Sequence, residues 1–224
     1  MNQLCIKQGA LGCEQFIYAD PTMNGGGPFF IEEFLSTKSI LNKFNATDSI
    51  MEMCCGLGAM GYYLAKKLNL NKIEFVDIDP EAAAGINYNK EFLDIETNFH
   101  LSSAFTKYKG GQVDLIILNP PHVTLESEFK QIAEETPEWF PSNSAKQANR
   151  SRLILIDKDF AFHKDFCKNA SSFLTLNGQI AFLENEKYIP HSKIEAELGD
   201  NFSYDFIQNS DIEGYYLLIA TKKD

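Results

Sequence analysis

The sequence predicts an α/β fold in which a mainly parallel sheet is covered by helices on both faces, and three observations support this prediction. Strand-like apolar runs alternate with helix-like segments between residues 49 and 198, which is the pattern of βαβ units. A complete G-x-G-x-x-G, formed by Gly56, Gly58 and Gly61, joins the first strand-like run to a helix-like run. Residues 113–118 are apolar enough to form a central strand.

The length and composition favour one domain. A chain of 224 residues with 44% hydrophobic and 12% aromatic content can build one sizeable core, and it is short for two. We therefore interpret residues 1–224 as a single domain. Residues 1–45 form a loop-and-helix extension before the sheet, and residues 123–152 form an insertion.

The periodic segments follow one another along the chain. Helices are expected at residues 28–44, 59–68, 81–92, 157–170 and 189–198. Strands are expected at residues 49–53, 72–77, 99–102, 113–118, 178–183, 202–208 and 215–221, the last two antiparallel to each other. Asp79 is expected to cap the helix that follows Pro80.

Two polar stretches interrupt this pattern. The first 28 residues read as irregular, because Gly25-Gly26-Gly27-Pro28 disfavours a helix or a central strand. A surface loop and a lid over a ligand, with contacts from Tyr18, Asp20, Phe29 and Phe30, are both left open. Residues 123–152 read as a long loop, which is either substrate-facing or a plain insertion.

The long loop holds residue types that suit a substrate site. It contains Trp139, the only tryptophan, and the only two arginines, Arg150 and Arg152. Arginine offers paired planar donors, so these two residues are either a clamp for a carboxylate or phosphate or ordinary surface residues.

Charge and cysteine content restrict the partners and the compartment. The net charge is −11, with 31 acidic against 20 basic residues, which disfavours a phosphate backbone as a partner. Five cysteines without a C-x-x-C pair make metal and disulfide scaffolds poor interpretations and favour a reducing compartment. No apolar run has the length of a membrane span, and the first residues lack a signal-peptide core. A cytoplasmic protein is expected.

The glycine pattern predicts an adenosine-containing cofactor. Its glycines allow a tight turn and a close approach of backbone to ligand. Asp77 ends the next strand-like run, where it can accept hydrogen bonds from ribose hydroxyls. Cys54 and Cys55 lie inside the turn and are interpreted as small buried side chains beside the cofactor, with a reactive thiol as the weaker alternative.

A second motif, Asn119-Pro120-Pro121-His122, follows the strand-like run of residues 113–118. It should therefore lie at the carboxyl edge of the sheet, where open α/β sheets bind ligands. The side-chain carbonyl of Asn119 and the backbone carbonyl of Pro120 can accept hydrogen bonds from a nitrogen nucleophile. The prolines stiffen the turn that holds these acceptors.

With both motifs in this order, residues 50–184 resemble the class I methyltransferases that use S-adenosylmethionine. Within them, the chain is similar to the amino-methyltransferases with an Asn-Pro-Pro-aromatic motif, a group that includes the glutamine methyltransferases of peptide-release factors and several adenine and guanine methyltransferases. The resemblance implies a Rossmann-like, doubly wound, seven-stranded sheet with an antiparallel last strand. It also implies S-adenosylmethionine as cofactor and S-adenosylhomocysteine as product.

The resemblance also implies roles for single residues. Glu52 matches an acidic residue near the methionine amino group of the cofactor, and Ser103 with Ala104 falls where relatives often have an acidic residue contacting adenine. His122 stands where the family usually has Tyr or Phe. It can stack on a planar substrate, act as a base or only cap the turn.

Together these arguments predict three groups of site residues. The catalytic residues are Asn119, Pro120 and His122. The cofactor contacts are Glu52, Cys54, Gly56, Gly58, Asp77, Ile78, Ser103, Ala104 and Asn119. The substrate contacts are Tyr18, Pro121, Trp139, Arg150 and Arg152, and no metal is expected.

The expected function is N-methylation of an amide or amine in a protein, peptide or small molecule. The first alternative is methylation of an RNA or DNA base, which needs a flipped or single-stranded base. The second is a non-catalytic subunit that binds the cofactor. A nicotinamide dehydrogenase fits the glycines but leaves Asn119-Pro120-Pro121 unexplained.

Overall fold

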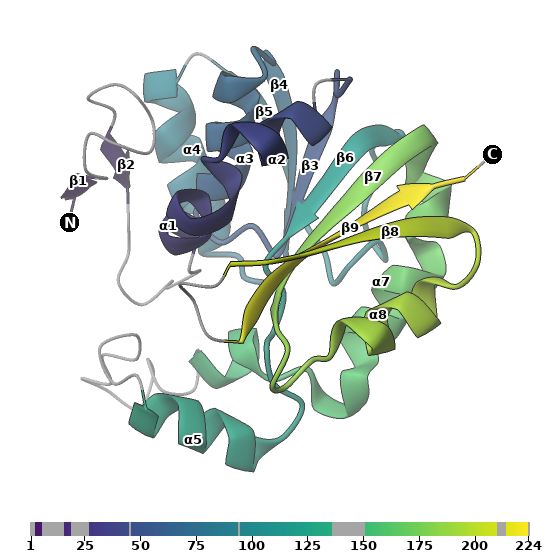
Figure 1. Cartoon of the computed structure of the whole chain (residues 1–224). Helices are drawn as coiled ribbons and strands as arrows, with labels where there is room; N and C mark the ends of the chain where they lie inside the picture. Colours follow the sequence, from purple (N-terminus) through teal and green to yellow (C-terminus); the bar gives the residue numbers. More distant parts are fainter. Residues whose placement is uncertain are drawn as a thin grey trace.

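A seven-stranded sheet runs through the middle of the protein (Figure 1). The computed structural model describes residues 3–5, 16–18, 27–44, 46–93, 95–135, 151–209 and 214–223. The strands of the sheet are β3 (Ile50–Met53), β4 (Lys72–Asp77), β5 (Glu96–Leu101), β6 (Val113–Leu118), β7 (Leu174–Asn185), β8 (Phe202–Gln208) and β9 (Tyr215–Lys222).

The strand order is β5-β4-β3-β6-β7-β9-β8. Strands β3 to β7 pair in parallel, whereas β9 runs antiparallel to both β7 and β8. The chain begins the sheet at its centre, builds outward through β4 and β5, and returns to the other side of β3 with β6. This order confirms the predicted doubly wound sheet and puts the point where the order reverses between β3 and β6.

Helices cover both faces of the sheet (Figure 1). One face carries α1 (Gly27–Phe30), a π-helical turn η1 (Ile31–Leu35), α2 (Lys38–Lys43), α3 (Ala59–Lys67) and α4 (Ala82–Leu93). The other face carries α7 (Ala161–Ala170) and α8 (His191–Leu198). A further helix, α5 (Glu126–Glu135), follows the carboxyl end of β6.

The sequence of β6 shows why two layers are needed. Leu115 and Ile117 pack into the core on the side of α3, whereas Ile116 and Leu118 pack into the core on the side of α7. All four side chains are fully buried. Because successive residues of a strand point to opposite faces, a continuous apolar strand requires a cover on both sides.

The helix expected at residues 28–44 is broken into three pieces. The amide of Ser36 donates to Ile31 O at 2.8 Å, a wide turn that ends the π-helical segment. The hydroxyls of Ser36 and Thr37 donate to the carbonyls of Glu32 and Phe34. These side chains compete with the helical backbone bonds, which explains the break.

Two other expectations were wrong in part. Residues 123–152 contain helix α5, and residues 151–155 are helical as well. The carboxylate of Glu128 accepts hydrogen bonds from the amides of Thr124 and Leu125, which satisfies amides at the start of α5. In the first 28 residues, β1 (Gln3–Cys5) pairs antiparallel with β2 (Phe16–Tyr18).

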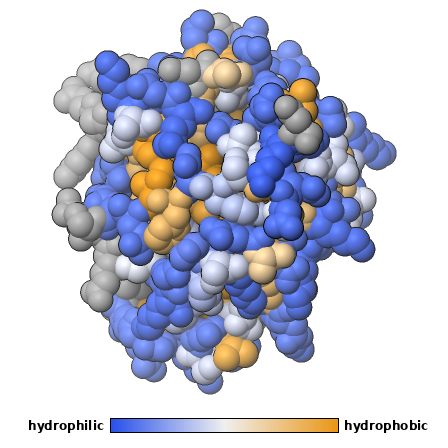
Figure 2. Space-filling model, turned by 45° about the vertical axis from the view of Figure 1, so that its right-hand side comes forward, coloured by the Kyte–Doolittle hydropathy of each residue, from blue (hydrophilic) through white to orange (hydrophobic). Residues whose placement is uncertain are grey.

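The face of the molecule drawn in Figure 2 is mostly hydrophilic, and hydrophobic side chains reach it in a few limited places. This agrees with the excess of acidic residues in the sequence. Among the described residues, no helix combines the length and apolarity that crossing a bilayer requires.

The glycine turn between β3 and α3 is packed tightly against the layer beneath it. Gly58 has a φ of 76°, and a Cβ added there would lie 2.5 Å from Ile86 Cδ1 and 2.8 Å from Phe75 Cε1. Gly56 also has a positive φ, of 49°, but a Cβ there would meet nothing within 4 Å. The backbone conformation therefore favours glycine at both positions. At Gly58 the neighbouring side chains also leave no room for a larger residue.

We predict that Gly58→Ala destabilises the fold more than Gly56→Ala. Both variants strain a left-handed residue by about 1 kcal/mol, and Gly58→Ala adds about 1–3 kcal/mol of overpacking. Urea unfolding followed by circular dichroism measures both free energies. Equal losses in the two variants would contradict the packing shown for Gly58.

Candidate functional site

A pocket of about 300 Å³ lies at the carboxyl edge of the sheet, where the strand order reverses. The segments that follow β3, β4, β5 and β6 line it together with α1 and residues 153–157. The lining residues are Phe29, Phe30, Met53, Cys54, Gly56, Val76, Asp77, Ile78, Asp79, Ser102, Ser103, Ala104, Asn119, Pro120, Pro121, His122, Leu153, Ile154, Leu155, Ile156, Asp157 and Phe162.

Asp77 ties the glycine turn to the loop after β4. Its Oδ2 accepts the amide of Gly56 at 2.8 Å, and its Oδ1 accepts the amide of Asp79 at 2.8 Å. Burial raises the pKa of Asp77, and these two hydrogen bonds partly offset the effect. Each carboxylate oxygen has a second acceptor position, so Asp77 can also accept two hydroxyl donors.

The chemistry of this half of the pocket fits an adenosine-containing cofactor. The Asp77 carboxylate offers acceptors for a ribose, and Gly56 permits close approach of its backbone. Ile78, 52% exposed, and Ala104 add apolar surface for a base. Asp79 accepts the amide of Glu81 at 2.9 Å, as expected for the residue that caps the start of α4.

The loop after β5 contributes Ser103 and Ala104, as the sequence predicts, and also Ser102. The hydroxyl of Ser102 accepts the amide of Lys107 at 2.8 Å, which fixes the turn. Ala104 has a φ of 44°, so the turn is sharp at the point where it faces the pocket.

The two cysteines of the turn differ in position. Cys54 lines the pocket, whereas Cys55 is buried in the core on the α3 side. Burial raises the pKa of both thiols well above their ordinary value, so both stay protonated near neutral pH. This agrees with the interpretation of small buried side chains and disfavours a reactive thiol.

Glu52 lies beneath the glycine turn and is not part of the pocket lining. Its Oε2 accepts the amide of Gly61 at 2.7 Å, and the side chain is buried. Burial raises the pKa of Glu52 to about 8, although the bond from Gly61 acts in the opposite direction. The structure therefore places this carboxyl as a support for the start of α3. Gly58 also lies outside the lining, in contact with Phe75.

All four residues of Asn119-Pro120-Pro121-His122 line the pocket, directly after β6. The next residue anchors the motif: Val123 donates to Leu155 O at 3.1 Å and accepts the amide of Asp157 at 2.7 Å. These bonds hold residues 155–157 beside the motif. The residues predicted to bind the cofactor and those predicted to bind the methyl acceptor therefore line one pocket.

Of the residues predicted to contact the substrate, only some lie at the pocket among the described residues. Pro121 lines the pocket, but the Arg152 guanidinium pairs with the Glu126 carboxylate at 2.8 Å and stays half-exposed. The backbone of Tyr18 lies in β2, and Trp139 and Arg150 lie outside the described residues. The arginine clamp remains a prediction.

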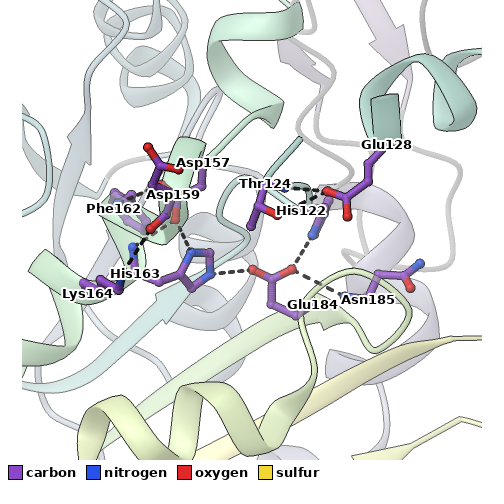
Figure 3. A network of polar contacts seen from close by, with 10 residues as sticks. All are labelled: His122, Thr124, Glu128, Asp157, Asp159, Phe162, His163, Lys164, Glu184 and Asn185. Carbon is purple, nitrogen blue, oxygen red and sulfur yellow. Dashed lines mark hydrogen bonds and ion pairs between the residues drawn. The ribbon is translucent and has the colours of Figure 1, made fainter. Parts of the chain in front are cut away.

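Four polar residues beside the pocket belong to none of the motifs in the sequence, namely Ser102, Asp157, His163 and Glu184. Glu184 shares one hydrogen bond with His122 and another with His163, and His163 in turn contacts Asp157 (Figure 3). One signal was available, because Glu184 falls near the end of the strand-like run of residues 178–183 and parallel strands end at a common edge. Asp157 was expected in a helix, but α7 begins at Ala161.

Comparison with known proteins supports the resemblance seen in the motifs. A family model described as "Methyltransferase small domain" matches residues 27–137. The release factor glutamine methyltransferase of Bacteroides thetaiotaomicron is 27% identical over 142 residues, which cover 62% of this chain and 48% of that protein. The ribosomal RNA large subunit methyltransferase G of Colwellia psychrerythraea is 25% identical over 124 residues, which cover 54% of this chain and 30% of that protein. The matched region thus spans less than half the length of either relative.

The fold has counterparts among solved structures. A methyltransferase from Pyrococcus furiosus superposes with a TM-score of 0.57 at 17% identity, over 85% of this chain and 83% of that one. Identity this low supports the fold alone. The seven-stranded, Rossmann-like sheet inferred from the motifs is confirmed.

We predict that Glu52→Gln removes a pH-dependent loss of stability. Because the folded pKa is raised to about 8, the unfolded chain ionises this carboxyl first as pH rises, and stability falls between about pH 5 and pH 8. A glutamine keeps an acceptor for the Gly61 amide and cannot ionise. At pH 8 the variant should be more stable than the parent by on the order of 3 kcal/mol, with little difference at pH 5.

Urea unfolding at several pH values measures this effect, and Glu74→Gln is the matched control. Burial raises the pKa of Glu74, but hydrogen bonds with Asn98, His100 and Lys72 outweigh it and lower the pKa overall. Its stabilising contribution is present above its ordinary pKa and is lost as pH falls, so the control should keep the decline toward pH 8. A parent protein whose stability is level from pH 5 to pH 8 would refute the role given to Glu52.

Proposed function

We propose that this chain, which has the fold and the sequence relatives of the class I S-adenosylmethionine-dependent methyltransferases, methylates an amide or amine nitrogen of a protein, a peptide or a small molecule. The observation that carries the proposal is the shared pocket. Asp77 and the glycine turn line one part of it, and Asn119-Pro120-Pro121-His122 lines another. Relatives described as glutamine methyltransferases of release factors act on protein side chains, which favours a protein acceptor.

The chain's own residues would hold the two reactants in place. Asp77 would accept the ribose hydroxyls, while the backbone at Gly56 and the side chains of Cys54, Ile78 and Ala104 would contact the rest of the cofactor. When bound, S-adenosylmethionine supplies an electrophilic methyl group on its sulfonium, and S-adenosylhomocysteine is the product. Transfer of this kind depends mainly on orientation and needs no metal.

Asn119 and Pro120 would position the acceptor. The side-chain carbonyl of Asn119 and the backbone carbonyl of Pro120 can accept hydrogen bonds from an N–H2 group, which orients its lone pair and stabilises the charge that develops on the nitrogen. The adjoining Pro121 limits the motion of these acceptors. Trp139, Arg150 and the rest of residues 123–152 remain candidates for contacts to the larger part of a substrate.

Methylation of an RNA base is the second candidate function. It is favoured by the relative described as a ribosomal RNA methyltransferase. The net charge of −11 opposes it, because affinity for nucleic acid comes largely from basic residues that neutralise phosphates. A protein acceptor in a cytoplasmic setting therefore fits the chain best, and a cofactor-binding subunit without activity is the third candidate.

We predict that Asn119→Ala lowers methyl transfer by about 100-fold or more at saturating cofactor, where a weakened cofactor contact no longer limits the rate. The measurement is incubation with methyl-labelled S-adenosylmethionine and a fractionated cell lysate. Asn71→Ala is the matched control, because Asn71 is exposed and precedes β4 at the opposite edge of the sheet. It should transfer label like the parent.

The location of the label separates the candidates. Label in protein or small-molecule fractions that is lost in Asn119→Ala supports the proposal. Label in nuclease-sensitive material supports the RNA alternative instead. Cofactor binding without label in any fraction, and with equal biological effect of both variants, would favour the non-catalytic subunit.

We predict that Asp77→Ala weakens binding of S-adenosylmethionine at least about tenfold. Loss of hydrogen bonds to a charged group costs about 1.5–3 kcal/mol, which corresponds to about 10- to 100-fold in affinity. Isothermal titration calorimetry measures the dissociation constant, and circular dichroism checks that the variant is folded. Unchanged affinity in a folded variant would contradict the role of Asp77.

A further inference from the structure

A row of four acidic and imidazole side chains runs from the pocket into the core (Figure 3). His122 Nδ1 lies 2.7 Å from Glu184 Oε2, and Glu184 Oε1 lies 2.8 Å from His163 Nε2. His163 Nδ1 lies 2.7 Å from Asp157 Oδ2. The row joins the end of β6, the end of β7 and the start of α7 through side chains alone.

The inner members of the row are sealed from solvent. His163 and Glu184 are 0% exposed, and Asp157 is 4% exposed. Buried charges are costly unless they are paired and hydrogen-bonded, and each of these groups has such a partner. The amides of Phe162 and His163 also donate to Asp157, at 2.7 and 3.1 Å, so its carboxylate is held from several sides.

The contacts of His163 define the charges in the row. Both ring nitrogens lie within hydrogen-bond distance of carboxylate oxygens, which favours the doubly protonated ring that donates from both. Burial alone would lower the pKa of His163, but the hydrogen bonds and charges of Asp157 and Glu184 outweigh it and raise the pKa. Burial alone would raise the pKa of Asp157, but its hydrogen bonds to His163 and to the Phe162 amide outweigh burial and lower it. Glu184 thus stands between a cation and His122.

This arrangement selects one tautomer of His122. Glu184 Oε2 lies 2.7 Å from His122 Nδ1, and a carboxylate only accepts hydrogen bonds, so this contact favours the neutral tautomer with its hydrogen on Nδ1. The remaining nitrogen, Nε2, is then an acceptor on a ring that lines the pocket. A buried carboxylate on Nδ1 orients the histidine base of hydrolytic triads in the same way.

Among the described residues, Glu184 contributes the carboxylate that contacts His122, and two aromatic rings pack beside the imidazole. From α1, the Phe30 ring packs with its centroid 6.0 Å away, and from β9 the Tyr215 ring does the same at 6.0 Å. Burial raises the pKa of Tyr215, so this ring stays neutral around neutral pH. Two aromatic walls and one carboxylate hold the imidazole in a single orientation.

We propose that His122 is the general base of methyl transfer, and that Glu184, His163 and Asp157 are positioning residues that direct the lone pair of its Nε2 toward the acceptor. The inference rests on the proposed function and deepens it. The acceptor nitrogen forms its bond to the methyl carbon, the electron pair of the broken carbon–sulfur bond stays on sulfur, and the acceptor's proton passes to Nε2. The substrate class is therefore an N–H group that must lose its proton during transfer, such as an amide.

A ring that only stacks on the substrate would need none of this row. Phenylalanine at position 122 would supply the same stacking surface, and no buried carboxylate would be needed behind it. The two roles therefore predict different turnover for His122→Phe and for Glu184→Gln. Either change should lower turnover if His122 is a base, and neither should if its ring only stacks on the substrate.

The first experiment measures tautomers by ¹⁵N NMR of the histidine side chains and needs no acceptor. The chain has only four histidines, so single substitutions assign the ring signals. In the parent, the neutral ring of His122 should carry its proton on Nδ1, and His163 should be doubly protonated. A proton on Nε2 of His122 in the parent would overturn the proposal.

Glu184→Gln is the decisive variant in the same spectrum. The glutamine carbonyl should take the His163 donor, so its NH2 group would face His122 and force the proton of that ring onto Nε2. An Nδ1 proton that persists in the folded variant would overturn the role of Glu184.

The second experiment uses methyl-labelled S-adenosylmethionine with the lysate fraction that accepts label from the parent. His122→Phe and Glu184→Gln should each lose about 100-fold or more in turnover, with cofactor affinity within about threefold. Added imidazole should restore part of the activity of His122→Ala but none of that of Asn119→Ala.

The two proposals fail in different ways. A parent that transfers no label would refute the proposed methyl transfer, while the NMR spectrum would still report whether the row selects the tautomer. His122→Phe with turnover within about threefold of the parent would refute the base and leave methyl transfer intact.

Discussion

The fold depends on one constraint, which is that both faces of the parallel sheet are covered. With helices on either side, the central strand β6 is apolar from Leu115 to Leu118, and these side chains pack alternately into the two cores. Polar chemistry then has room only where the strands end. Asp77, Ser103 and Asn119 all follow such ends, and the reversal of strand order between β3 and β6 brings them to one pocket.

Tight packing beneath the glycine turn connects stability with the site. Gly58 and Gly61 let α3 approach Phe75 and Glu52 so closely that any larger residue would collide. The Glu52 carboxyl is accommodated there because it holds its proton and accepts the amide of Gly61. The same turn presents Gly56 to Asp77. Glu52 and Gly58 thus help to shape the cofactor part of the pocket, although neither residue lines it.

The buried row from Asp157 to His122 is a costly way to join three elements. An apolar contact could hold α7 against β7 without desolvating two carboxylates and an imidazolium. What the charged row adds is direction: in the role proposed for it, each group defines the hydrogen-bonding role of the next, so that His122 presents an acceptor to the pocket. The same row holds residues 155–157, which Val123 also anchors, beside the motif.

The sequence by itself determined the features that lie in contiguous strings of residues. The alternation of strands and helices, the glycine turn, Asp77 and Asn119-Pro120-Pro121-His122 were all predicted, because local periodicity and motif spacing define them. Only the tertiary structure decided which distant side chains meet. His122 and Glu184 are 62 residues apart, and their contact exists because β6 and β7 end side by side. The same holds for two further features. Glu52 is buried away from the pocket, and residues 153–157 line it. Both follow from packing between elements, which leaves no signal in the local sequence.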